Sequence, residues 1–128
     1  MISTLQRYAT YATLAVVLGS IHLTKPVMAD GQSLPAGTYQ IRLTDESPKP
    51  MPGLAPDASK WVEFVQGGKV VGREIASIFT AAEIGQHVKG PMPKANGSRV
   101  DGLKGGEYVR IWFNKGGRHY LINLGGSK

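Results

Sequence analysis

The chain has 128 residues, with 15 Lys and Arg against 9 Asp and Glu, a formal charge of +6 and no cysteine. This length fits one domain. The absence of cysteine excludes a disulfide framework, a thiolate metal site and a cysteine nucleophile. The 17 glycines and 8 prolines argue against a helix bundle, because both residues interrupt helices.

The first 29 residues have the pattern of a secretory signal peptide. Arg7 precedes a mostly apolar run over residues 12–23, and small residues fit a cleavage site after Ala29. The run is too short to span a membrane, which takes about 20 residues. The sequence therefore predicts a periplasmic or secreted protein of residues 30–128, with 99 residues, a charge of +4 and no transmembrane segment.

Three early segments are rich in β-branched and aromatic residues and predict strands: 38–44, 60–66 and 69–79. The proline-rich segment 45–59 between the first two predicts a long loop.

Gly67 and Gly68 separate the second and third predicted strands and predict a two-residue hairpin turn, since such turns need positive φ. This register places Phe64 opposite Val71 and Val62 opposite Arg73. The core face would then carry Val62, Phe64, Val71 and Ile75, and Trp61, Glu63 and Glu74 would share the other face.

Thr80 and Glu83 have the spacing of a capping box and predict a short helix over residues 81–88. Lys89, Gly90 and Pro91 end it. Residues 89–106 then predict a glycine- and proline-rich loop.

Segments 107–113 and 118–124 predict a final hairpin. A three-residue loop with Gly117 in the left-handed region pairs Trp112 with Tyr120 and separates apolar from polar side chains best. The core face would then carry Val109, Ile111, Phe113 and Leu121. The opposite face would carry Tyr108, Arg110, Trp112, Arg118, Tyr120 and Ile122.

The predicted order is β-β-β-α-β-β in one mainly β domain over residues 30–128, with a tail at 125–128. We expect a small antiparallel barrel or curled sheet with one short helix, and an OB-like topology is compatible with this order.

The leading functional hypothesis is an exported, non-enzymatic binding domain that presents an aromatic-basic face to an anionic or glycan-like ligand. Aromatic rings and guanidinium groups together can stack on rings and pair with anions. The candidate ligand-binding residues are Tyr108, Arg110, Trp112, Arg118 and Tyr120. The opposing interpretation is that these rings pack inside the protein. Nucleic acid is not expected as a partner of an exported protein, and the sequence predicts no cofactor.

An alternative is a protein–protein component, such as an enzyme inhibitor or an accessory subunit of a periplasmic complex, that acts through the 45–59 loop. Two hypotheses are weaker. Glu63 and Glu74, as diagonal neighbours, could act as the acid and base of a hydrolase. His87, His119, Met51 and Met92 could bind Cu(I), but their scattered spacing predicts no metal site.

Overall fold

The computed structural model describes residues 16–48, 58–103, 105 and 107–126. These residues form nine strands and one short helix. The elements are β1 Val16–Leu23, β2 Val27–Ala29, β3 Gln32–Leu34, β4 Gly37–Leu43, β5 Ser59–Gln66, β6 Lys69–Thr80, α2 Ala81–His87, β7 Ser98–Leu103, β8 Tyr108–Lys115 and β9 Arg118–Gly126.

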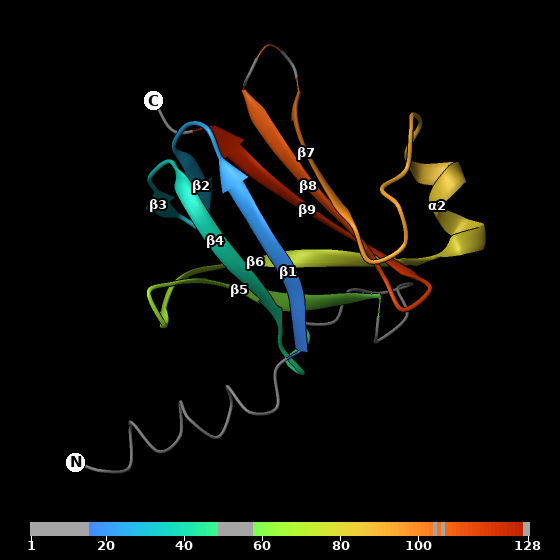
Figure 1. The fold of residues 1–128 in the computed structure, drawn as a ribbon, viewed down its shortest axis with the longest axis horizontal. Helices are drawn as coiled ribbons and strands as arrows, with labels where there is room; N and C mark the ends of the chain where they lie inside the picture. The colour runs from blue at the N-terminus through green and yellow to red at the C-terminus, as the bar shows by residue number, and fades with distance from the viewer. Residues whose placement is uncertain (1–15, 49–57, 104, 106, 127–128) are drawn as a thin grey trace.

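The strands form one curled antiparallel sheet, a half-barrel (Figure 1). Neighbouring strands pair in the order β1, β4, β5, β6, β9, β8 and β7. Strand β9 extends beyond its pairing with β6, and its end pairs with β2, which in turn pairs with β3. The predicted fold class, a small antiparallel β structure with one short helix, is confirmed. Strands β1, β2, β3 and β7 were not expected from the sequence.

The core lies on the inner face of the curled sheet, where every second side chain of each strand points. It includes Tyr39 and Ile41 of β4, Phe64 of β5 and Ile111 of β8, each at most 1% exposed. Burial of each such side chain stabilises the fold by about 1.5–3 kcal/mol. Since the chain has no cysteine, this apolar packing stabilises the sheet without disulfides.

The Gly67–Gly68 hairpin is confirmed, with both glycines at positive φ. A β-bulge after Phe64 shifts the register by one residue, so Phe64 lies opposite Gly72 and not Val71. A Cβ at Gly72 would lie 3.0 Å from Cδ2 of Leu34, so β3 approaches β6 closely at this point. The shift also moves Glu74 opposite Val62.

The predicted register of the last hairpin is wrong by one residue. The turn consists of Gly116 and Gly117, both at positive φ, and Lys115 pairs with Arg118. Two such glycines suit the two-residue turn whose twist matches that of the strands. Trp112 therefore lies opposite Leu121 and not Tyr120.

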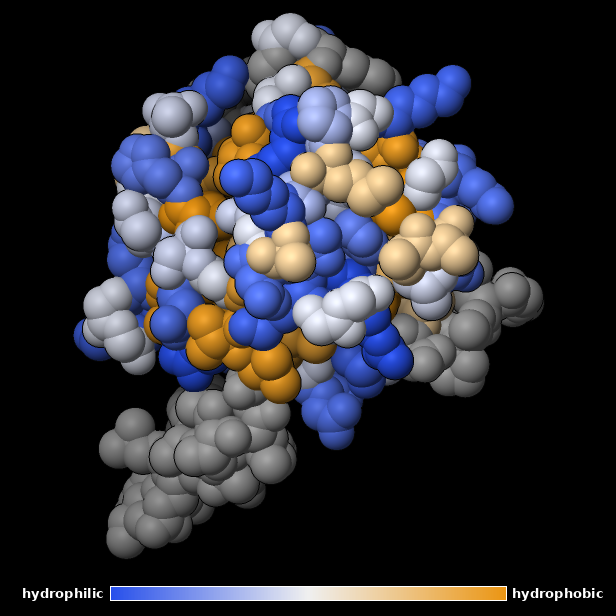
Figure 2. All heavy atoms as spheres, turned by 45° about the vertical axis from the view of Figure 1, so that its right-hand side comes forward, coloured by the Kyte–Doolittle hydropathy of each residue, from blue (hydrophilic) through white to orange (hydrophobic). Residues whose placement is uncertain are grey.

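Helix α2 begins at the predicted capping box, in which Thr80 and Glu83 bond reciprocally. It lies to one side of the sheet (Figure 1). Its Ile84, with Val88 just beyond its end, packs on Trp112 and Leu121 and forms a second apolar cluster on the outer face of β8 and β9. The face seen in Figure 2 mixes hydrophilic side chains with small hydrophobic patches. Among the described residues, no helix is long and apolar enough to cross a membrane.

Candidate functional site

The predicted aromatic-basic face is divided by the observed register. Tyr120 points inward and belongs to the main core, and Trp112 is buried beneath α2. Arg118 is exposed beside the Gly116–Gly117 turn, at the far end of the hairpin from Tyr108. Tyr108 and Arg110 remain together on the outer face of β8, two residues apart.

Trp112 has a structural role in the second apolar cluster. It is 1% exposed, and its Nε1 donates a hydrogen bond of 2.9 Å to Nδ1 of His119. Burial lowers the pKa of His119 and favours the neutral ring that accepts this bond. These two residues therefore satisfy each other's polar groups inside the protein and are not available to a ligand.

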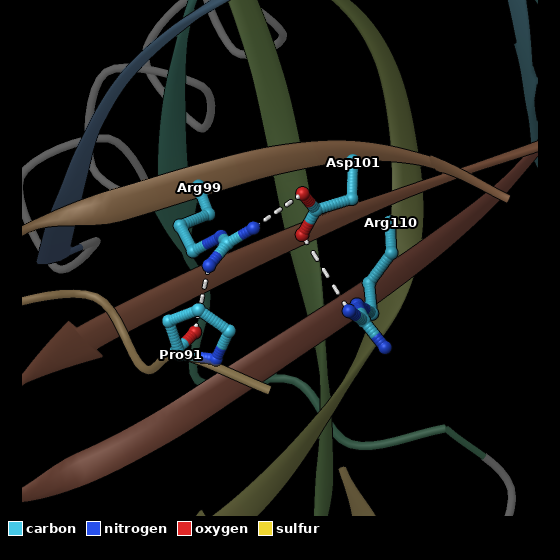
Figure 3. Close-up of polar contacts among 4 residues, drawn as sticks. All are labelled: Pro91, Arg99, Asp101 and Arg110. Carbon is cyan, nitrogen blue, oxygen red and sulfur yellow. Dashed lines mark hydrogen bonds and ion pairs between the residues drawn. The ribbon is translucent and has the colours of Figure 1, made fainter. Parts of the chain in front are cut away.

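A charged cluster of Arg99, Asp101 and Arg110 lies on the outer face of β7 and β8 (Figure 3). We call it the arginine cluster. Nη2 of Arg99 donates to Oδ1 of Asp101 over 2.9 Å, and Nη2 of Arg110 lies 3.5 Å from Oδ2 of the same carboxylate. Nη1 of Arg99 donates to the carbonyl oxygen of Pro91 over 2.9 Å, which fixes this guanidinium against the preceding loop.

The arginine cluster carries two positive charges and one negative charge. Its side chains are partly accessible, with 35% of Arg99, 21% of Asp101 and 20% of Arg110 exposed. Nε of Arg110 is buried and has no hydrogen-bond partner among the described residues. The Arg110 guanidinium also lies 5.7 Å from the centre of the Trp112 ring, within the range of a cation–π contact. The cluster thus keeps a net positive charge, and the unpartnered Nε of Arg110 lies beneath its surface.

Tyr108 extends this surface along β8. Tyr108 is 45% exposed, and its side chain lies on the same face as that of Arg110. Arg99 and Asp101 were missed by the sequence reasoning because residues 98–103 lay in the predicted loop 89–106. The alternation of polar and apolar residues over Arg99, Val100 and Asp101 could have revealed a strand there.

Glu63 and Glu74 are not the diagonal neighbours that the weaker hydrolase hypothesis requires. Glu63 lies opposite Arg73 and Glu74 opposite Val62, so the two carboxylates point to opposite faces of the sheet. Glu74 accepts hydrogen bonds from the backbone N–H groups of Asp30, over 2.8 Å, and Ile75, over 3.0 Å. These bonds attach the β2–β3 turn to β6, in the part of β6 that does not pair with β9.

The two histidines of the copper hypothesis make different contacts in the structure. His119 bonds Trp112, while the ring of His87 stacks near Phe79 with centroids 4.5 Å apart. Met51 lies outside the described residues, as does most of the 45–59 loop on which the protein–protein hypothesis rests. In the part of the chain that the structure describes, no group of three or more His, Cys, Asp or Glu side chains could hold a metal ion.

Comparison with known proteins gives no match, whether against protein-family models, curated proteins or solved structures.

Proposed function

We propose that this protein is a non-enzymatic binding domain whose arginine cluster and Tyr108 bind an anionic, glycan-like ligand. The observation that carries the proposal is that one carboxylate, Asp101, is shared by two guanidinium groups on a partly exposed sheet face. Because two cations share one anion, the cluster attracts a second anion.

The chemistry of the residues supports an anionic ligand. A guanidinium group presents five N–H donors in a plane and binds carboxylate, sulfate or phosphate oxygens in pairs. Arg110 is held by both Asp101 and the Trp112 ring, and its side chain is 20% exposed. We expect an incoming oxyanion to bind at the accessible parts of the Arg99 and Arg110 guanidinium groups.

The position of Tyr108 supports a ligand that contains a ring. A half-exposed tyrosine combines an apolar ring with a polar hydroxyl and suits contact with a sugar. The high sequence pI of about 9.7 favours polyanions in general. A periplasmic or secreted location, where acidic glycans occur, stays a prediction from the sequence.

The test is calorimetric titration with a sulfated oligosaccharide and its unsulfated counterpart at low salt. We expect the wild-type protein to bind the sulfated form, and Arg110→Gln to lose at least about tenfold in affinity, as for loss of a charged hydrogen bond. Arg118→Gln is the matched control, because it removes an exposed arginine of the same hairpin outside the cluster. Equal loss in both variants, or no binding by folded wild-type protein, would contradict the proposal.

A further inference from the structure

We propose that residues 16–29 stay in the folded protein as strands β1 and β2, so that any leader removed from this chain ends before Val16. This inference concerns the extent of the mature domain and does not depend on the proposed ligand. It replaces the sequence-based prediction that a leader is cleaved after Ala29.

Strand β1 is an integral part of the sheet. It pairs with β4 from Val16 to Leu23, and its Leu18, Ile21 and Leu23 are at most 5% exposed in the main core. Ser20 and His22, which alternate with these residues, are exposed on the outer face. Such alternation is typical of a half-buried strand. Burial in the core therefore accounts for Leu18, Ile21 and Leu23 of the apolar run that indicates a leader.

The predicted cleavage site lies inside a tight hairpin. Ala29 ends β2, and Asp30 lies in the turn that leads to β3 at Gln32. The backbone N–H of Asp30 donates to Glu74, and its carboxylate lies 3.5 Å from Nε of Arg73. A cut between Ala29 and Asp30 would sever the β2–β3 turn at the residue that attaches it to β6.

Removal of residues 1–29 would also open the core. Val27 and Ala29 are fully buried, and β2 pairs with the end of β9. Without β1, the edge of β4 would lose its partner, and Tyr39 and Ile41 would lose the strand paired with their backbone. A small domain without disulfides has too little net stability to lose five buried apolar side chains.

The direct experiment is expression of the full chain with its own N-terminus, in a bacterial host that secretes proteins. The folded, protease-resistant product is then analysed by N-terminal sequencing and intact mass. We expect the N-terminus at or before Val16. A folded product that begins at Asp30 would overturn the inference.

A matched pair of variants of the full chain tests the same point through stability. Ile21 faces the core and its neighbour Ser20 faces solvent. We expect Ile21→Ala to lower the melting temperature of the purified protein by at least about 10 °C. Ser20→Ala should change it by less than about 4 °C, as for most surface substitutions.

If Ile21→Ala does not fold, the milder substitution Ile21→Val takes its place. We expect Ile21→Val to lower the melting temperature by about 5 °C. Equal melting temperatures for Ile21→Val and the wild-type protein would contradict retention of β1. The ligand titration is a separate readout, because the arginine cluster lies on β7 and β8. Failure of this inference and failure of the proposed function can therefore be told apart.

Discussion

The indole N–H of Trp112 donates to Nδ1 of His119 beneath helix α2, over 2.9 Å. A protonated imidazole has no free nitrogen lone pair and cannot accept this bond. Burial lowers the pKa of His119 from its ordinary value of 6.5. The unfolded chain therefore binds a proton more readily than the folded protein. The contribution of this histidine to stability is complete above about pH 6.5 and is lost as the pH falls further.

This pH dependence can be measured by urea unfolding at pH 7.5 and pH 5. We expect a lower urea midpoint for the wild-type protein at pH 5, and a smaller difference in His119→Gln, whose amide oxygen can still accept from the indole. Because carboxylates also titrate at acidic pH, the comparison between the two proteins is the informative quantity. An identical change in urea midpoint between pH 7.5 and pH 5 in both proteins would show that His119 does not contribute to the pH dependence of stability.

Two glycines should respond in opposite ways to substitution by alanine. At Gly19 in β1, with φ of 154°, a Cβ would lie 2.9 Å from Cε1 of the buried Phe113. We expect Gly19→Ala to lower the free energy of unfolding by about 1–3 kcal/mol, as for an overpacked core.

Gly85 in α2 is exposed, and a Cβ there would meet no atom within 4 Å. Gly85→Ala should raise the free energy of unfolding by about 0.5–1 kcal/mol, because alanine favours the helix. Denaturant unfolding of both variants checks the pair. A neutral Gly19→Ala would mean that β1 and β8 are not in close contact.

The N-cap of α2 should affect stability through its hydroxyl group. The side chain of Thr80 accepts from the backbone N–H of Glu83 over 3.2 Å. Thr80→Ala should cost about 1 kcal/mol. Thr80→Ser retains the hydroxyl acceptor, so its free energy of unfolding in urea should stay close to that of the wild-type protein. Similar losses in both variants would assign the effect to the methyl group of threonine.

The two glutamates of the hairpin β5–β6 should differ in their effect on stability. Glu74→Ala leaves the backbone N–H groups of Asp30 and Ile75 without their acceptor and should cost about 1 kcal/mol. Glu63→Ala, at a partly buried position on the other face, should cost less, as for most substitutions away from such hydrogen bonds. Thermal unfolding distinguishes them, and the reverse order would contradict the role of Glu74 as an acceptor for the β2–β3 turn.

Features set by neighbouring residues could be predicted from the sequence. The Gly67–Gly68 turn needs positive φ, and the capping box needs only Thr80 and Glu83, so both follow from short segments. The last hairpin was also predicted, but its register depends on which two residues form the turn. A shift of one residue exchanged the faces of Tyr120 and Leu121 and so divided the predicted site.

Features set by distant partners could not be predicted. Strand β1 is stabilised by β4, and β2 by β9, which lies about a hundred residues away in the sequence. Arg99 becomes part of the candidate site only because β7 pairs with β8. No local pattern indicated that Trp112 would be covered by Ile84 of the helix.

The most direct test of the central claim is a nuclear magnetic resonance titration of the ¹⁵N-labelled protein with the sulfated oligosaccharide. The proposed function predicts the largest amide shifts at Arg99, Asp101, Tyr108 and Arg110 on β7 and β8. It predicts small shifts at Arg118, near the turn of the same hairpin. Shifts centred elsewhere, or no shifts at millimolar ligand, would contradict the assignment of the arginine cluster as a ligand site.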